Sequence, residues 1–338
     1  MTGGPVIVDV LTGFLGAGKT SLIRRLGEAG ALADTALLVN EYADLPVDQR
    51  LLGLSGLKAD VLGDTCLCCV IDDDLRSSLL KLLDLRAKGE VPAFSRILIE
   101  TSGMAYPAPL VATLAKDPLL HPRLKLGTVA ALVDVCHYAD TLRDQEEARA
   151  QIVAADRILL TKRDLAPAGA VETAIRVMTK INPLAELESA DPMKAGAEIF
   201  RPVPRLRPSH DGEMAPTDKH AHFHDRMATL VLRWPEPLDW AMFATWLSLL
   251  LHRHGRSVLR IKGVMTVAGE EKHGPLFIQC VRHVVHEPEH CPDETAATGA
   301  EIVMILRDID PALVRRSFEV FMARAATPAM PKSVAATA

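Results

Sequence analysis

Apolar residues in the first 200 positions of the chain fall into short runs that are separated by amphipathic stretches. Runs typical of buried strands occupy residues 6–11, 36–40, 96–101, 128–135 and 157–161. Helical spacing of apolar residues predicts helices after residue 18 and near 73–88, 107–116, 138–154 and 168–181. Strands that alternate with helices predict an α/β domain whose mostly parallel sheet is covered on both faces.

The pattern changes at residue 201. Four prolines between residues 201 and 220 are separated by polar residues, which indicates an extended connector. Beyond it, strand-like runs at 227–233, 258–267, 276–285 and 302–306 accompany amphipathic stretches at 238–252 and 311–323. This order predicts a smaller α+β domain, with an antiparallel sheet backed by two helices. We therefore expect domains at 1–200 and 222–327, a linker at 201–221 and a flexible tail at 328–338.

A glycine-rich segment follows the first predicted strand. Residues 13–20, GFLGAGKT, fit the phosphate-loop pattern G-x-x-x-x-G-K-[ST] between a strand and a helix. Backbone N–H groups of such a loop surround phosphate oxygens, Lys19 would reach the β- and γ-phosphates, and the Thr20 hydroxyl would bind Mg²⁺. The alternative, an ordinary glycine-rich turn, does not require this complete motif. The domain is thus predicted to be a P-loop NTPase that binds its nucleotide through Gly13, Gly16, Ala17, Gly18, Lys19, Thr20 and Ser21.

Two further strand ends carry candidate nucleotide contacts. The run at 96–101 ends in Glu100, which we expect to hold Mg²⁺ or its water, and Gly103 follows with an N–H for the γ-phosphate. After the strand at 157–161, residues 161–164 read Thr-Lys-Arg-Asp, so Thr161, Lys162 and Asp164 match a guanine-binding segment. A carboxylate there accepts hydrogen bonds from the N1–H and N2–H₂ edge of guanine, which favours GTP over ATP. Solvated charged residues at these positions are the alternative.

Three of the six cysteines lie within four positions, at Cys66, Cys68 and Cys69. Three thiols so close together predict a site for Zn²⁺, Co²⁺ or a related ion. The spacing does not fix how many of them bind the ion, and buried core thiols or a redox pair are the alternatives. Cys136, Cys280 and Cys291 stand apart and are expected to be packing or surface residues.

Two groups of histidines leave their role open. His220, His222 and His224 alternate at the end of the connector, where weak metal binding and a plain polar linker are equally compatible with the pattern. A second group lies near a predicted turn and is interpreted as surface residues; it comprises His283, His286, His290 and Cys291.

Composition and charge exclude several classes of protein from the possible functions of this chain. Among 338 residues, 49% are hydrophobic and only 4% aromatic, and the formal net charge is −5. Binding to a nucleic-acid backbone requires a basic surface, so we expect no nucleic-acid partner. No apolar run approaches the ~20 residues of a membrane span, and the first ten residues lack a basic signal-peptide region. We expect a cytoplasmic protein without membrane contact.

The motifs together resemble the CobW family of GTP-hydrolysing metallochaperones, within the SIMIBI class of P-loop GTPases. The resemblance rests on residues 13–20, 66–69, 97–103 and 161–164 and extends to residues 260–263, Arg-Ile-Lys-Gly, in the second domain. Residues 40–48 are similar to the family's switch I segment. The chain departs from the family pattern at Ala43, Thr65 and Tyr106, where the family usually has glycine, glycine and aspartate.

The resemblance implies a mechanism. Lys19, Thr20 and Glu100 would organise GTP and Mg²⁺, and Asp48 would act near the Mg²⁺ or the attacking water. The cysteines would hold the cargo metal, with an oxygen from Glu41 as a further ligand, and GTP hydrolysis would release the metal to a client metalloprotein. Zn²⁺ is the expected cargo, with Co²⁺ and Fe²⁺ open, and a homodimer is one open form of assembly. The alternatives are an ATP-dependent small-molecule kinase with structural cysteines and a metal buffer or sensor that hydrolyses no nucleotide.

Overall fold

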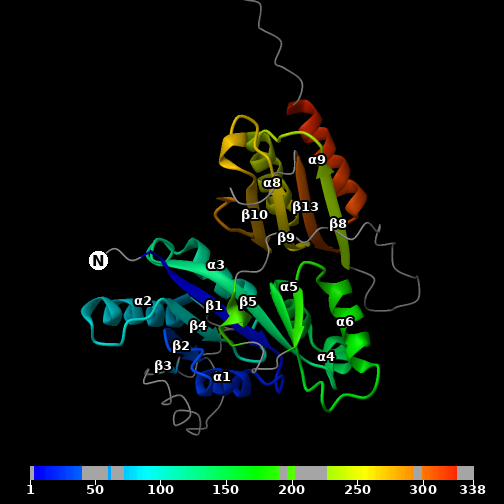
Figure 1. The fold of residues 1–338 in the computed structure, drawn as a ribbon. Helices are drawn as coiled ribbons and strands as arrows, with labels where there is room; N and C mark the ends of the chain where they lie inside the picture. Colours follow the sequence, from blue (N-terminus) through cyan, green and yellow to red (C-terminus); the bar gives the residue numbers. More distant parts are fainter. Residues whose placement is uncertain are drawn as a thin grey trace, which may run out of the picture. The chain divides into compact units, whose positions relative to one another are not determined.

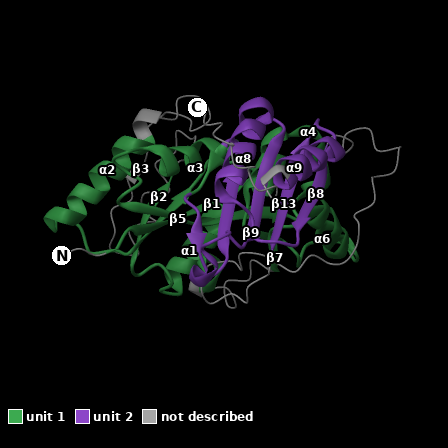
Figure 2. Cartoon of the chain, turned by 90° about the horizontal axis from the view of Figure 1, so that it is seen from above, with its two compact units in different colours: residues 1–209, 284–286 green, residues 210–283, 287–338 purple. Residues whose placement is uncertain are grey.

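Seven parallel strands form the sheet of the first part of the chain, in the order β3-β2-β4-β1-β5-β6-β7 (Figure 1). The structure is a computed structural model that describes residues 4–39, 60–61, 72–189, 196–201, 227–291 and 299–325. The chain divides into two compact units, residues 1–209 with 284–286 and residues 210–283 with 287–338 (Figure 2). Residues 202–226 and 326–338 lie outside the described residues; they include the expected linker at 201–221, apart from Arg201, and the expected tail at 328–338.

The first unit alternates strands with helices as the apolar pattern predicts. Its strands are β1 (Val6–Gly13), β2 (Thr35–Val39), β3 (Asp60–Val61), β4 (Arg96–Glu100), β5 (Leu124–Asp134), β6 (Arg157–Thr161) and β7 (Glu186–Ser189). Its helices are α1 (Lys19–Glu28), α2 (Asp72–Lys88), α3 (Pro107–Lys116), α4 (Tyr138–Asp144), α5 (Glu146–Ala154), α6 (Ala170–Ile181) and the 3₁₀ turn η3 (Gly196–Phe200).

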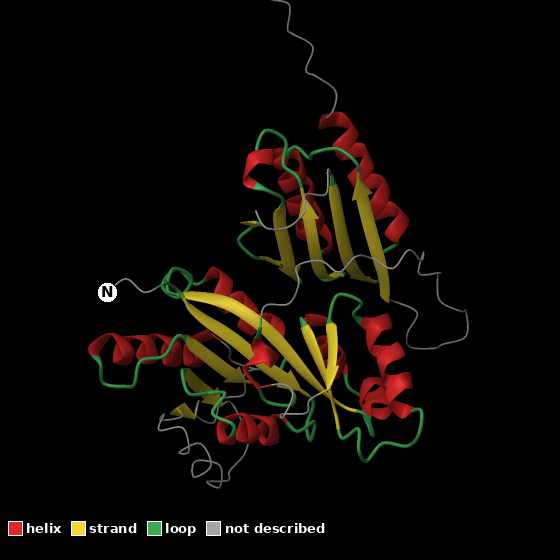
Figure 3. Ribbon diagram, in the orientation of Figure 1, coloured by secondary structure: helices red, strands yellow, loops and turns green. Residues whose placement is uncertain are grey.

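Both faces of this sheet are buried. Leu98 on β4 belongs to a core that also contains Leu22 and Leu26 of α1, whereas the adjacent Ile97 and Ile99 point to the opposite face and are equally buried. Figure 3 shows helices on both sides of these strands. The expected α/β architecture with a mostly parallel sheet is therefore confirmed.

The second sheet, formed by the chain from residue 227 onwards, is antiparallel with strand order β11-β10-β9-β13-β8, in which β12 pairs with β10. The elements are β8 (Met227–Trp234), α8 (Trp240–His254), β9 (Val258–Met265), η4 (Glu271–His273), β10 (Leu276–Val281), β11 (Val284–Val285), β12 (Glu289–His290), β13 (Ala300–Arg307) and α9 (Pro311–Ala325). Alternate strand residues and one face of both helices share a core around Phe243, Trp246 and Phe318. The Trp246 and Phe318 rings meet edge to face at 5.1 Å in this core. The antiparallel sheet together with α8 and α9 confirms the small α+β fold.

The structure differs from the sequence prediction at two places where no glycine or proline signals a break. The helix expected at 138–154 is two helices, because Gln145 is extended (φ −128°, ψ 113°) and the acidic residues Glu146 and Glu147 begin a new first turn. The strand expected at 276–285 is a hairpin, because Arg282 adopts a left-handed conformation with φ 52°. Among the described helices, none combines the length and the apolar character that a membrane crossing needs.

A buried carboxylate lies in the middle of the first sheet. Asp9 on β1 accepts a hydrogen bond from the Thr128 amide at 2.6 Å and pairs with the Arg96 guanidinium. Burial raises the pKa of Asp9 to about 6, although the Thr128 amide and Arg96 act in the opposite direction. A Cβ on Gly127 would lie 2.3 Å from the Asp9 carboxylate, so the close approach of β5 requires a glycine there.

This carboxylate makes stability depend on pH. The folded chain protonates Asp9 below about pH 6, whereas the unfolded chain does so only near the ordinary value of 3.8. The folded state then binds more protons between these values, so the contribution of Asp9 to the free energy of unfolding is largest at low pH. It falls by about 3 kcal/mol as the pH rises through 6. The free energy of unfolding in urea is measured for the natural chain and for Asp9→Asn between about pH 3.8 and pH 6. The variant should lack the pH-dependent contribution of Asp9; identical pH profiles of the two chains would contradict this prediction.

Candidate nucleotide site

The phosphate loop can form because glycines stand at the positions where its backbone adopts positive φ angles. Gly13 ends β1 with φ 145°, Gly16 has φ 74°, and Gly18 has φ 97° immediately before α1. A Cβ on Gly13 would lie 2.6 Å from the Leu132 carbonyl oxygen, so a larger residue cannot stand there without a shift of backbone. The loop thus places the positive N-terminus of α1 at the carboxyl edge of the sheet, where anions bind.

Lys19 lies across this loop. Its ammonium donates hydrogen bonds to the carbonyls of Gly13 at 2.8 Å and Phe14 at 3.5 Å, and only 9% of the residue is exposed. The positive charge is therefore held inside the curve of the loop, where a polyphosphate would meet it.

The end of β4 meets the beginning of α1 through one side-chain contact. The Thr20 hydroxyl donates to Glu100 Oε1 at 3.0 Å, although the two residues are 80 positions apart, and Glu100 is 4% exposed. Next to this pair, the Thr101 hydroxyl donates to the Thr12 hydroxyl at 2.9 Å. A hydroxyl and a carboxylate oxygen are the hard donors that Mg²⁺ takes, so the residues that sequence reasoning assigned to this ion lie together and suit it.

The segment after β4 packs closely on the loop. A Cβ on Gly103 would lie 2.6 Å from the Leu15 amide nitrogen, so only glycine permits this approach. The buried Gln151 of α5 donates from Nε2 to the carbonyls of Gly103 and Ala105, each at 3.0 Å. Sequence analysis overlooked Gln151, because nothing in its own segment signals that it holds a loop 48 residues earlier.

The end of β6 also reaches the phosphate loop. The Thr161 hydroxyl donates to the Ala17 carbonyl at 2.9 Å, and Lys162 has a left-handed backbone with φ 56°. The Lys162 ammonium lies 2.7 Å from Asp134 at the end of β5, while Asp164 is exposed. Residues 161–164 therefore lie at the same edge of the sheet as the phosphate loop.

Asp134 is a second residue that sequence analysis did not single out. Burial raises its pKa, but hydrogen bonds from Lys162, His137 and the Cys136 amide outweigh this and hold the pKa below its ordinary value. Asp134 is ionised at neutral pH and fixes the Lys162 side chain. A pocket of about 220 Å³ opens here, lined by the phosphate loop at residues 14–17 and by residues of β5, α4 and α5 together with Lys162.

Several residues expected at the site lie outside the described residues. They are the switch candidates Glu41 and Asp48, the thiols Cys66, Cys68 and Cys69, and the histidines His220, His222 and His224. Of the other three cysteines, Cys280 and Cys291 are buried, and Cys136 is partly buried. Burial raises the pKa of Cys280 to about 12, so this thiol stays protonated and is suited to packing rather than to metal binding.

Two family models account for most of the chain. The nucleotide-binding domain described as CobW/HypB/UreG matches residues 7–188, and the cobalamin synthesis protein cobW C-terminal domain matches residues 227–322. The chain belongs to the CobW family. The first model covers the sheet and the loop that carry Lys19, Thr20 and Glu100, and the second covers the antiparallel unit.

Curated members of the CobW family match along both units. The zinc chaperone YjiA of Escherichia coli (strain K12) is 31% identical over 79% of this chain and 83% of its own length. The zinc chaperone CobW of a Sinorhizobium species is 29% identical over 92% of this chain and 96% of its own length. The crystal structure of Zn(II)-bound YjiA GTPase from E. coli covers 94% of this chain and 99% of that chain, with a TM-score of 0.66 and 24% identity, which shows a shared fold.

Proposed function

We propose that this chain is a GTP-hydrolysing metallochaperone that binds Zn²⁺ at Cys66, Cys68 and Cys69 and delivers it to a client metalloprotein as GTP is hydrolysed. The observation that carries the proposal is the match of both units to relatives named zinc chaperones, in a chain whose Thr20 and Glu100 meet beside the phosphate loop.

The nucleotide half of the proposal rests on charge and position. Lys19 supplies a fixed positive charge to the β- and γ-phosphates, and backbone N–H groups of the loop surround them. Thr20 and Glu100 would hold Mg²⁺, which neutralises charge that develops on the phosphates. Gly103, whose carbonyl accepts from Gln151, lies beside the loop and would offer its N–H to the γ-phosphate, and Asp48 would orient the attacking water. Hydrolysis by this arrangement is mainly positioning and electrostatic stabilisation.

Guanine selection is assigned to the end of β6. The Thr161 hydroxyl anchors this segment to the phosphate loop, and the left-handed backbone at Lys162 turns the chain so that Asp164 remains exposed. The Asp164 carboxyl group would accept hydrogen bonds from the N1–H and N2–H₂ groups of guanine, whereas adenine offers a ring nitrogen in place of the first donor.

Replacing Asp164 tests this selection. Loss of a charge-assisted pair, worth about 1.5–3 kcal/mol, predicts that Asp164→Ala reduces the preference for GTP over ATP by about 10- to 150-fold. Asp164→Asn should instead favour xanthosine triphosphate, because its C2 carbonyl accepts from the asparagine amide where guanine carries an amino group. Competition binding with GTP, ATP and xanthosine triphosphate measures the nucleotide preference of each variant. Glu172→Gln on α6 serves as the control. If ATP competed as well as GTP and Asp164→Ala left this unchanged, the assignment of guanine selection to Asp164 would be contradicted and the kinase alternative would gain support.

The metal half of the proposal rests on thiol chemistry and on the relatives. Three thiolates are soft ligands that bind Zn²⁺ tightly and also accept Co²⁺ and Fe²⁺, and Glu41 would add an oxygen. The names of YjiA and CobW favour zinc among these ions. Coupling to GTP follows if the nucleotide orders the segment between the switch at 40–48 and the cysteines.

Metal analysis tests this site. Full-length chain is purified with a non-hydrolysable GTP analogue, once with its natural sequence and once with Cys66, Cys68 and Cys69 changed to serine; Cys136→Ser serves as the matched control. We expect one Zn²⁺ to be lost from the triple variant and retained in the control. Equal metal content in natural and triple-variant chains would move the cargo site elsewhere, with His220, His222 and His224 tested next.

A further inference from the structure

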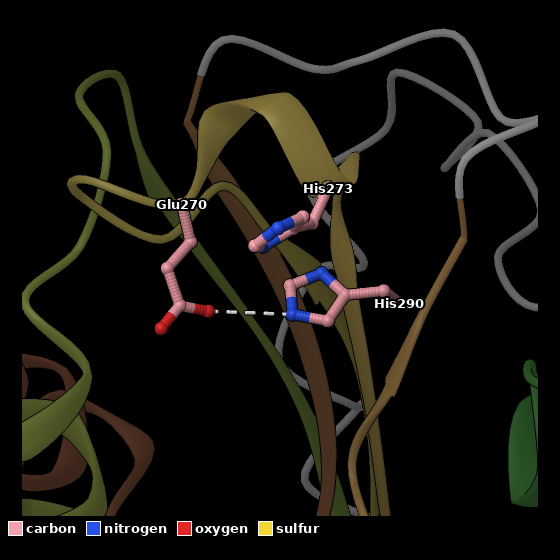
Figure 4. A group of neighbouring side chains, drawn as sticks. All are labelled: Glu270, His273 and His290. Carbon is pink, nitrogen blue, oxygen red and sulfur yellow. Dashed lines mark ion pairs between the residues drawn. The ribbon is translucent and has the colours of Figure 1, made fainter.

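A turn and a short strand of the second unit bring one carboxylate and two imidazoles together. Glu270, His273 and His290 each offer one ligand atom, and these atoms all lie within 4.8 Å of one another (Figure 4). Glu270 and His273 are exposed and His290 is partly exposed, so an ion could reach them from solvent. The sequence pattern places His290 in one group with His283, His286 and Cys291, whereas in the structure its ligand atom lies near those of Glu270 and His273.

The turn η4 places two of the three residues on one side. The His273 amide donates to the Glu270 carbonyl at 2.9 Å, which closes one 3₁₀ turn. Because a 3₁₀ helix has three residues per turn, residues three apart project in the same direction. Gly274, with φ 78°, then ends the turn and leads into β10.

The third residue is held against this turn by main-chain pairing. His290 lies opposite Leu276 in the antiparallel pair of β10 and β12, and the Cys291 amide donates to the Pro275 carbonyl at 2.9 Å. The backbone of all three residues is thus fixed by hydrogen bonds that do not depend on the side chains. A site on such a frame needs only side-chain rotation to close around an ion.

The hydrogen bonds of His290 define which ring nitrogen carries a proton. Nδ1 lies 3.1 Å from the Gly274 carbonyl oxygen, and a carbonyl can only accept, so Nδ1 is the donor. In the neutral ring Nε2 then presents a lone pair, and it lies 3.3 Å from Glu270 Oε2, which is also an acceptor. Two acceptors at this separation require a proton or a metal cation between them. An imidazole that donates its other N–H to a backbone carbonyl is the arrangement typical of histidine ligands to metals.

The donor set selects a class of ion. Two imidazole nitrogens and one carboxylate oxygen suit Zn²⁺ and neighbouring divalent transition ions, and three protein ligands leave a fourth position for water or an incoming group. The ring of His273 meets that of His290 edge to face, with centroids 5.4 Å apart, so both rings already border the same space.

We propose that Glu270, His273 and His290 form a second metal site, for a divalent transition ion such as Zn²⁺. It uses no cysteine and binds without nucleotide. The site lies entirely within the second unit and does not depend on the proposed function of the phosphate loop or of Cys66, Cys68 and Cys69.

The test uses untagged full-length chain in which Cys66, Cys68 and Cys69 are serine, without nucleotide. Zn²⁺ affinity is measured by competition with a chromophoric chelator, and Co²⁺ is added as a spectroscopic probe. Glu270→Gln, His273→Ala and His290→Ala are compared with two matched controls, Glu271→Gln and His252→Ala. Glu271 is next to the site but accepts from the Gly269 amide, and His252 is an exposed histidine of α8.

We expect one Zn²⁺ equivalent in the chain with serine at positions 66, 68 and 69 and in both controls. Each site substitution should weaken its binding by at least the roughly 10- to 100-fold that even the loss of an outer hydrogen-bond partner costs. Bound Co²⁺ should show d–d bands without thiolate charge-transfer absorption. Glu270→Gln keeps the size of the side chain and guards against a folding defect, which circular dichroism checks. The proposal would be overturned if this Zn²⁺ equivalent were absent or if the three variants bound Zn²⁺ with unchanged affinity. It would also be overturned if the controls lost as much Zn²⁺ affinity as the variants.

Discussion

Changing Glu100 to glutamine should lower kcat for GTP hydrolysis by about 100- to 1,000-fold, the cost of removing one electrostatic partner of a transition state. The amide keeps the size of the side chain and can still accept from Thr20, which now lies 3.0 Å from Oε1. It removes the negative charge that would hold Mg²⁺ against the phosphates. The Mg²⁺ concentration required for half-maximal activity should therefore rise, while folding stays intact. Single-turnover hydrolysis across a Mg²⁺ series measures both quantities.

Glu146→Gln is the matched control for this variant. Glu146 is an exposed glutamate in the first turn of α5 and is not a candidate ligand of Mg²⁺. Its kcat and Mg²⁺ requirement should equal those of the natural chain. If Glu100→Gln behaved like this control, Glu100 would be no part of the Mg²⁺ site.

Changing Arg157 to methionine should reduce the free energy of unfolding by about 3–5 kcal/mol, the usual cost of removing one partner from a buried ion pair. The Arg157 side chain is fully buried, and it pairs with Glu186 at 2.9 Å and with Glu188 at 2.7 Å. It also donates to the Glu198 carbonyl of η3 at 3.1 Å. Without it, the Glu186 carboxylate remains buried without this charge. Urea denaturation measures the loss.

A surface arginine and a double variant separate charge from packing. Arg143 is exposed and pairs with Asp140 at 2.5 Å and Asp144 at 3.2 Å, so Arg143→Met should leave stability unchanged within error. Adding Glu186→Gln to Arg157→Met should restore part of the stability, because it removes the buried negative charge that Arg157 had paired. A loss in Arg157→Met no larger than in Arg143→Met would show that the buried pair contributes nothing.

The sequence could predict those parts of the fold that depend on residues close to one another along the chain. The alternation of apolar strands and helices predicts the parallel sheet, and the phosphate-loop motif contains Lys19, which bonds to the loop carbonyls, and Thr20, which contacts Glu100. A strand end followed by Glu100 was informative because parallel strands bring their carboxyl ends to one edge.

The parts that sequence could not predict depend on contacts between distant segments. Gln151 supports Gly103 only because α5 packs beside the segment after β4. In the same way, His290 meets Glu270 only because β12 pairs with β10 next to η4. The break between α4 and α5 at Gln145 is not marked by a glycine or a proline in the sequence. Each of these features is set by packing or pairing, which a single-sequence pattern does not contain.

Control of zinc binding at Cys66, Cys68 and Cys69 by GTP is tested by the Zn²⁺ affinity of the chain in three nucleotide states. The chain carries His290→Ala so that the second site does not contribute, and affinity is measured with a non-hydrolysable GTP analogue, with GDP and without nucleotide. We expect binding about 5- to 150-fold tighter with the analogue than with GDP, the usual range of coupling between two sites. We also expect this difference to disappear when the three cysteines are serine. Equal affinity in all three states would show that the nucleotide does not control zinc binding at these cysteines.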